Sequence, residues 1–252
     1  MDNPIRLHWL DPRDPDQLFP PTHLAMRDPN GLLAIGGDLT PRRLLRAYAQ
    51  GIFPWYNPDE PILWWCPDPR AVLHPQELHV ARSLRQAVRR SDYAVTLDHA
   101  FAEVMEACAG ERHGSRGTWL GPDMKAAYQQ LHTLGHCHSV EVWREGRLIG
   151  GLYGISLGRV FFGESMFSHA DNASKIALYW LCEQLKAWHF ELIDCQINSA
   201  HLMSLGAHEI QRDTFLGQLA NAVRLSAKSG PWRFDIAAPQ DAVHLPLSSA
   251  AR

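Results

Sequence analysis

The sequence predicts an α+β protein, with a small N-terminal domain and a larger domain built on a mixed, largely antiparallel sheet. Three strand-like segments follow one another and are separated by glycine-containing turns: 137–144, 147–155 and 159–164. A helix-length segment at 172–188 separates this meander from a further strand-like segment at 191–197. Helices combined with an antiparallel meander in this way are typical of α+β domains.

The first 75 residues are expected to form the small domain. Residues 1–30 are rich in Pro and Asp and are predicted to be irregular. A helix is predicted over 41–50, because Thr40 can cap it, Pro41 suits its first position and Gly51 ends it. Residues 52–75 contain six prolines among three tryptophans. This composition predicts a loop pinned by its aromatic side chains, without a long helix or a central strand.

The larger domain is predicted over 76–235, and residues 236–252 are expected to form a C-terminal tail. Its other helices are predicted at 79–90, 98–109, 121–134, 199–205 and 213–226. A last strand is predicted near 208–211. Asp171 or Asn172 would cap the long helix at 172–188.

Length and composition indicate an ordinary globular protein. The chain has 252 residues, of which 46% are hydrophobic and 20% charged, enough for a substantial core. No apolar run approaches the roughly 20 residues that span a bilayer, and the N-terminus lacks the plan of a signal peptide. A cytoplasmic location without a membrane partner is therefore expected. A net charge of −3 means that any RNA contact must come from local patches and shape.

The cysteines and histidines do not predict a metal site. Five cysteines are odd in number and scattered, so they form neither a disulfide framework nor a zinc ribbon. The run His136-Cys137-His138 contains metal-ligand types, but on a strand the cysteine would face away from both histidines. We expect no metal.

Three polar residues stand at the ends of predicted strands. Glu164 precedes the long helix, where it can orient a substrate amine or serve as an exposed capping carboxylate. Asp194 and Gln196 share one face of an apolar strand by its period of two. Burying such groups unpaired costs about 1–3 kcal/mol, so they either satisfy each other at a sheet edge or serve a function. We favour a functional role.

Aromatic residues supply a second set of candidates. Trp55 lies in the proline-rich segment and Trp119 lies between glycines, and both are candidates for stacking on a nucleobase, worth about 1–3 kcal/mol per base. Trp64 and Trp65 are assigned to the core.

Basic residues form two clusters on predicted helices. Arg82, Arg85 and Arg89 recur on one helix face with Arg90 adjacent, and Arg42, Arg43 and Arg46 form the second cluster. Such stripes can neutralise tRNA phosphates, although most are merely solvated faces. We assign the phosphate contacts to the first cluster.

Several long and unusual strings closely resemble the leucyl/phenylalanyl-tRNA–protein transferase family, and the likeness runs from about residue 25 to 220. They are Asn30–Leu39, Gly51–Tyr56, Pro61–Arg70, Gly117–Trp119, Gly135-His136, His138–Trp143, Gly163–Phe167, Asn172–Lys175 and Ile193–Gln196. The resemblance implies a small N-terminal domain joined to a GNAT-like acyltransferase domain, which also suits the predicted order of strand, long helix and strand.

The same resemblance implies an enzyme, a leucyltransferase that acts as an aminoacyl-tRNA–protein transferase. Leu-tRNA and Phe-tRNA would be the donors, with Met as a further candidate. Proteins that begin with Arg or Lys would be the acceptors, and the added residue would mark them for N-degron degradation.

The resemblance also assigns roles to individual residues. Glu164, Asp194 and Gln196 correspond to the catalytic group, and Trp55 and Trp119 to the pair that holds the 3′ adenosine. The pocket for the aminoacyl side chain would be lined by Leu152, Phe161, Met166, Leu178, Leu181, Leu185 and Ile193. In a regular strand Ile193 would face away from Asp194.

The chemistry that this implies needs no cofactor, ATP or metal, because the donor is already an activated ester. Two hypotheses describe the proton transfer. In the first, Asp194 polarises Gln196, whose amide oxygen draws a proton from the amine, while Glu164 orients the amine or the ribose hydroxyls. In the second, the vicinal hydroxyl of the tRNA carries the proton and the side chains only position the reactants.

Three rival functions are considered. An acetyl-CoA-dependent N-acetyltransferase would need a glycine-rich cradle at the start of the long helix, and residues 168–174 contain no glycine. A peptidoglycan-type aminoacyl-tRNA ligase shares the chemistry but is generally longer. A module that only shelters the aminoacyl end of tRNA would keep the tryptophans and arginines without requiring Asp194 and Gln196 together.

Overall fold

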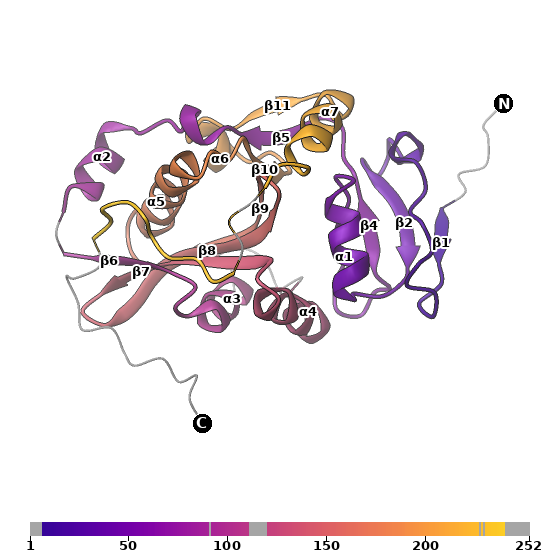
Figure 1. Ribbon diagram of the computed structural model, residues 1–252, viewed down its shortest axis with the longest axis horizontal. Helices are drawn as coiled ribbons and strands as arrows, with labels where there is room; N and C mark the ends of the chain where they lie inside the picture. Colours follow the sequence, from indigo (N-terminus) through magenta and orange to yellow (C-terminus); the bar gives the residue numbers. More distant parts are fainter. Residues whose placement is uncertain (1–6, 91, 111–119, 227, 229, 240–252) are drawn as a thin grey trace.

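The protein was analysed as a computed structural model, which describes residues 7–90, 92–110, 120–226, 228 and 230–239. Within these residues the strands form two sheets, one of four strands and one of seven. Figure 1 shows the small sheet with its helix at one end of the molecule and the large sheet, with helices on both faces, at the other. The predicted α+β architecture is confirmed.

The small sheet has the order β1-β2-β4-β3. Its strands are β1 (His8–Leu10), β2 (Leu32–Gly36), β3 (Phe53–Pro54) and β4 (Leu63–Trp65). A 3-10 turn, η1 (Thr22–Leu24), precedes β2. The helix α1 (Pro41–Tyr48) begins as predicted, because the side chain of Thr40 accepts a hydrogen bond from the backbone N–H of Arg43.

The proline-rich segment 52–75 contains central strands, so that part of the sequence prediction is wrong. β4 lies between β2 and β3, and β5 (Arg70–Leu73) lies between β10 and β11 of the large sheet. Both strands are short enough to fit between prolines, and Pro54 occupies an edge strand, where no ladder N–H is required. The chain passes from the small sheet to the large one between Trp65 and Arg70.

The large sheet has the order β11-β5-β10-β9-β8-β7-β6. The strands not yet defined are β6 (Ala94–Leu97), β7 (Cys137–Arg144), β8 (Arg147–Leu157), β9 (Val160–Ser168), β10 (Leu192–Gln196) and β11 (His208–Ile210). Among the described strands of this sheet, β9 and β10 are the only parallel neighbours, and the other ladders are antiparallel. The predicted meander is confirmed, with a longer third strand, whereas β6 was not predicted.

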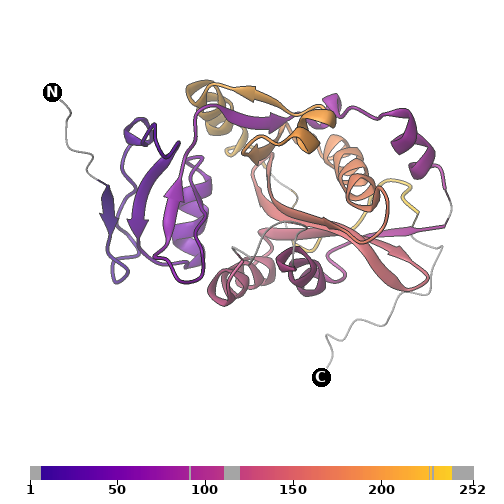
Figure 2. The ribbon, with the colours of Figure 1, turned by 180° about the vertical axis from the view of Figure 1, so that it is seen from behind.

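Helices cover both faces of the large sheet. They are α2 (Arg82–Val88), α3 (Phe101–Ala109), α4 (Pro122–Thr133), α5 (Ala173–Ala187), α6 (Ala200–Ser204) and α7 (Arg212–Ala222), with a 3-10 turn η2 (Pro75–Glu77) after β5. Figures 1 and 2 show α5 on one face, and α3 and α4 on the other. None of the helices in the described segments combines the length and apolar character needed to cross a membrane.

The start of α5 differs from the predicted cap. Asn172 occupies the N-cap position with a φ of 63°, and its side chain makes no capping hydrogen bond. The hydroxyl of Ser168 instead accepts a hydrogen bond from the backbone N–H of Ser174, at 3.2 Å. The last strand of the meander therefore supplies the cap of the helix that follows it.

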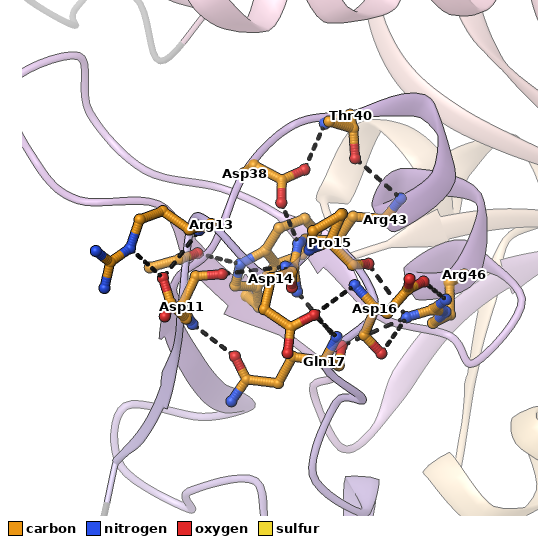
Figure 3. A network of polar contacts seen from close by, with 12 residues as sticks. Asp11, Arg13, Asp14, Pro15, Asp16, Gln17, Asp38, Thr40, Arg43 and Arg46 are labelled. Carbon is orange, nitrogen blue, oxygen red and sulfur yellow. Dashed lines mark hydrogen bonds and ion pairs between the residues drawn. The ribbon is translucent and has the colours of Figure 1, made fainter.

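The second basic cluster holds the N-terminal segment rather than forming a free surface. Arg43 is fully buried, and its Nε donates to Asp38 while its guanidinium also donates to the carbonyls of Asp11 and Asp14 (Figure 3). Arg46 donates to backbone oxygens between Pro15 and Gln17 in the same way. These contacts hold residues 8–17 in place beside α1.

Replacing Arg43 by Met is expected to lower the free energy of unfolding by about 3 kcal/mol, because it leaves Asp38 and several carbonyls without their donor. Urea unfolding followed by circular dichroism measures the change. Arg42→Met is the matched control: its ion pair with Asp16 is exposed, so a loss below about 1 kcal/mol is expected. Equal losses in the two variants would contradict a structural role specific to Arg43.

Candidate active site

A cavity of about 350 Å³ lies between the small N-terminal domain and the larger domain. Its apolar wall comes from β5, β8, β9, α5 and β10, and the mouth is completed by Phe53, Pro54 and Trp55 of the small domain. The expected pocket residues that line it are Leu152, Phe161, Met166, Leu178, Leu181 and Ile193. Leu185 does not line the cavity; it is fully buried in the core between α5 and the sheet.

A bulge in β10 shapes the polar side of this pocket. The ladder between β10 and β5 shifts register between Asp194 and Gln196, and Gln196 has a φ of 61°. Because the bulge breaks the alternation of side chains, Ile193 and Gln196 both line the cavity, whereas Asp194 does not. The expectation that Asp194 and Gln196 share one face is therefore wrong, and Ile193 lies in the pocket because it faces away from Asp194.

Asp194 is buried behind the pocket wall and paired with Arg70. Arg70 donates from Nε and Nη2 to the two carboxylate oxygens, at 2.8 and 2.6 Å, and both side chains are almost inaccessible to solvent. The guanidinium also lies over the rings of Phe53 and Phe215, at 4.9 and 4.6 Å from their centroids. A buried Asp194 requires a partner, but no sequence pattern identifies Arg70 as that partner.

Asp194 contacts the backbone of Gln196, not its side chain. The carboxylate Oδ1 accepts the backbone N–H of Gln196 at 2.9 Å. This bond holds the left-handed conformation of Gln196 and so fixes the direction of its side chain. The hypothesis that Asp194 polarises the Gln196 amide oxygen directly has no contact to support it here.

Glu164 is the centre of the polar cluster. Its carboxylate accepts hydrogen bonds from the hydroxyls of Tyr48 and Tyr128, at 2.8 and 2.7 Å, and from Nε2 of Gln196 at 2.9 Å. Tyr48 comes from α1, Tyr128 from α4 and Gln196 from β10, so the small domain, one helix of the large domain and the neighbouring strand converge on one side chain. The two tyrosines were not among the residues predicted from the sequence.

Burial and hydrogen bonding oppose each other at Glu164. Loss of hydration raises the pKa of Glu164 to about 7, although the hydrogen bonds from Tyr128, Tyr48 and Gln196 lower it. Burial, followed by the charge of Glu164, raises the pKa of Tyr48 and of Tyr128 well above their usual range. The phenols therefore remain donors, and Glu164 titrates near neutral pH.

The side chain of Gln196 presents one free atom to the cavity. Its Nε2 is committed to Glu164, and within the described residues Oε1 has no protein partner. An amide oxygen in this position can accept a hydrogen bond from an amine that enters the pocket. The cluster can thus orient a nucleophile beside an apolar cavity.

The aromatic candidates are only partly placed. Trp55 lines the mouth of the cavity and is 43% exposed, which leaves one side of its ring available for a ligand. Trp55 also contacts Trp65: the ring centroids are 5.8 Å apart, and Nε1 of Trp65 donates to the carbonyl of Trp55. Trp64 is fully buried, as its assignment to the core requires. Trp119 lies outside the described residues.

The four arginines assigned to phosphate contacts lie in and just after α2. Arg82, Arg85, Arg89 and Arg90 are all exposed, and among the described residues none of them forms an ion pair. The helix packs against α5, whose side chains line the cavity. Their positive charge is therefore available to a polyanion.

Activity is expected to fall as the pH is lowered through 7, because protonation of Glu164 removes an acceptor that three donors share. The α-amine nucleophile that the sequence resemblance implies, with a pKa of about 7.7–8.0, must also be deprotonated. Below both values the logarithm of kcat/KM should therefore approach a slope of two for the native protein and of one for Glu164→Gln. Initial rates at constant ionic strength measure both slopes, and equal slopes would contradict titration of Glu164.

In the larger domain the parallel strands β9 and β10 are joined by α5 and open over an apolar cavity with a polar rim, an arrangement that agrees with the GNAT-like acyltransferase fold that the sequence resemblance implies. Family comparisons are more specific. Residues 72–220 match the model described as leucyl/phenylalanyl-tRNA protein transferase, and residues 37–68 match the model of its N-terminal domain. The chain belongs to the leucyl/phenylalanyl-tRNA–protein transferase family. It is an aminoacyltransferase that moves an aminoacyl group from tRNA to protein.

Curated relatives agree over nearly the whole chain. A leucyl/phenylalanyl-tRNA–protein transferase of Nitrosospira multiformis is 56% identical over 90% of this chain and 97% of its own length. Those of Nitrosomonas europaea and Yersinia pestis are 55% and 60% identical, over 89% and 81% of this chain and 95% and 85% of their own lengths.

Solved structures match more distantly. L-PGS from Bacillus licheniformis aligns with a TM-score of 0.36 and 12% identity, over 54% of this chain and 49% of that one. A GCN5-related N-acetyltransferase from Kribbella flavida aligns with a TM-score of 0.35 and 11% identity, over 63% and 56%. The chain spans about half the length of these two proteins, and the likeness says nothing of its reaction.

Proposed function

We propose that the donors are Leu-tRNA and Phe-tRNA, with Met-tRNA as a further donor, and that the acceptors are proteins with an N-terminal Arg or Lys. The added residue would mark these proteins for N-degron degradation. The observation that carries the proposal is the hydrogen-bonded pair Glu164 and Gln196 at the edge of an apolar cavity with Trp55 at its mouth. Membership of a family named for leucyl and phenylalanyl transfer to protein supports the same donors.

The cavity suits a hydrophobic side chain that is not branched at Cβ. Its lining of Leu, Phe, Met and Ile side chains offers no charged partner on the apolar side. Because one methylene changes binding in such a pocket by only about 1–3 kcal/mol, Leu and Phe can share it. Ile and Val would be disfavoured by shape.

The adenosine would stack on Trp55, with Trp119 as its second partner, and the arginines of α2 would contact phosphates of the tRNA.

In the reaction, the acceptor amine attacks the ester carbonyl, the C–N bond forms, and the C–O bond to the ribose breaks. Gln196 Oε1 would accept a hydrogen bond from the amine and so hold the lone pair of the amine nitrogen toward the ester carbonyl. The proton released would pass through the vicinal ribose hydroxyl to the leaving ribose oxygen. Holding the two reactants in place can supply roughly 7–11 kcal/mol of the barrier.

Transfer of labelled Leu from Leu-tRNA to a peptide that begins with Arg tests this function. Label in the Arg peptide, but not in a matched peptide that begins with Ala, is the expected result. Label retained by the protein alone would instead indicate a tRNA-binding module. Acetyl transfer from acetyl-CoA, without aminoacyl transfer, would indicate an N-acetyltransferase.

Replacing Leu181 by Phe is expected to raise the ratio of Leu to Phe transfer by about tenfold, because the larger ring occupies space that the Phe side chain needs. A competition between equal amounts of Leu-tRNA and Phe-tRNA in one reaction measures the ratio. Any loss of folded enzyme cancels in this ratio. An unchanged ratio would show that Leu181 does not contact the aminoacyl side chain.

A further inference from the structure

Three potential metal ligands meet at one edge of the large sheet, outside the pocket. They are His74, directly after β5, Glu77, at the end of η2, and His208, at the start of β11. One ligand atom of each lies within 4.8 Å of those of the other two. Figure 1 shows β5 and β11 side by side at this edge, and none of the three residues lines the active-site cavity.

The sheet register places the two histidines on the same face. His208 pairs with Val72 across the antiparallel ladder between β11 and β5, and His74 lies two residues beyond Val72. Because side chains alternate along a strand, His74 and His208 are diagonal neighbours on one face. Their rings are stacked with centroids 5.7 Å apart and planes inclined by 27°.

The hydrogen bond of His74 leaves its other nitrogen ready to bind a metal ion. Nδ1 of His74 lies 2.9 Å from the carbonyl oxygen of Glu191. A carbonyl can only accept, so Nδ1 carries the hydrogen and Nε2 of the neutral ring keeps its lone pair. A backbone carbonyl that fixes the tautomer in this way is the usual outer partner of a metal-binding histidine.

Backbone contacts hold Glu77 near His208. The N–H of Glu77 donates to the carbonyl of His74, and the N–H of His79 donates to the carbonyl of Leu205. Gly206 has a φ of +98°, and a Cβ at this position would lie 2.5 Å from the Glu77 carbonyl oxygen. The turn between α6 and β11 therefore packs tightly on η2, which brings ligands from distant parts of the chain together.

We propose that His74, Glu77 and His208 bind a divalent transition-metal ion of the zinc type, with water as the fourth ligand. Two imidazoles and a carboxylate suit zinc, whereas magnesium and calcium prefer oxygen ligands. Metal–ligand bonds of about 2.0–2.2 Å require the three ligand atoms to lie closer to one another than 4.8 Å. Rotation of Glu77, which is exposed, can bring its carboxylate closer to the two imidazoles, and small rotations of the imidazole rings would complete the coordination.

The ion would join η2 to the segment that leads into β11. Ser199, His201 and Leu202, in and beside α6, line the active-site cavity and precede this segment. A bound ion would therefore stabilise one wall of the pocket without contacting the reactants. The expectation of no metal came from the scattered cysteines, the run 136–138 and the activated donor, and did not consider the three proposed ligands.

Calorimetric titration of the untagged, chelator-treated full chain with zinc chloride tests the site. One equivalent is expected to bind, and His208→Gln and Glu77→Gln are each expected to weaken binding by at least about tenfold. The melting temperature should rise with zinc in the native protein and not in these variants. His23→Gln, an exposed histidine outside the cluster, is the matched control and should behave as the native protein does.

Two results would overturn the proposal: no binding of zinc by the native protein, or binding of equal strength in both ligand variants. Melting temperatures measured in chelator show whether each variant is folded. Should His208→Gln be unfolded, Glu77→Gln decides the question, because its exposed side chain contributes nothing to the core. Magnesium chloride in place of zinc chloride is expected to give no heat and no shift in melting temperature.

Discussion

Replacing Gln196 by Ala is expected to lower the single-turnover rate of aminoacyl transfer by about 10²–10³-fold, a loss typical of a removed group that positions or stabilises the reacting atoms. The variant loses both the bond to Glu164 and the free Oε1 that faces the cavity. The apolar wall and Trp55 are untouched, so affinity for the charged tRNA end should change little. Preformed Phe-tRNA, an Arg-initiated peptide and rapid quenching measure the rate.

Gln196→Glu separates positioning from proton transfer. A carboxylate at this position retains an acceptor but loses the N–H that binds Glu164, and it places a second negative charge beside the first. We expect it to be as slow as the Ala variant at pH 8. At lower pH, where one of the two carboxyls is protonated, its rate relative to that of the native protein at the same pH should partly recover. A near-native rate for Gln196→Ala would remove this side chain from the chemistry.

The sequence was sufficient to predict elements whose signals are local. α1 begins at Pro41 because Thr40 caps it, and the meander follows the glycine turns at 145–146 and 157–158. Six of the residues that the family resemblance assigned to the aminoacyl pocket line the cavity. Leu185 is the exception, because it lies on the same helix face but beneath the pocket floor.

Contacts between distant segments could not be predicted in this way. Glu164 has partners on α1, α4 and β10, and nothing near Tyr48 or Tyr128 in sequence indicates a shared carboxylate. Strand periodicity failed at Asp194 and Gln196 because it assumes a regular ladder, whereas the bulge that matters is stabilised by Asp194 itself. Pairing with Arg70 depends on β5, a strand that proline content had argued against.

Replacing Arg70 by Met is expected to destabilise the protein by about 3–5 kcal/mol, because Asp194 would remain buried without a counter-charge. The contacts of the guanidinium with Phe53 and Phe215 would be lost as well. Urea unfolding measures the change. Arg212→Met is the control. Arg212 lies near this site, but its side chain donates to a backbone carbonyl, that of Cys66, so its replacement should lower the free energy of unfolding by less.

The double variant Arg70→Met with Asp194→Leu tests what the ion pair is for. Apolar side chains of similar volume can replace a buried ion pair at little cost, so much of the lost stability should return. Transfer activity should nevertheless stay low, because the backbone N–H of Gln196 no longer has the carboxylate that holds its left-handed conformation. Recovery of stability without activity would make Asp194 a positioning residue that acts through Gln196. Recovery of both would show that the pair serves only the fold, and that the bulge in β10 forms without it.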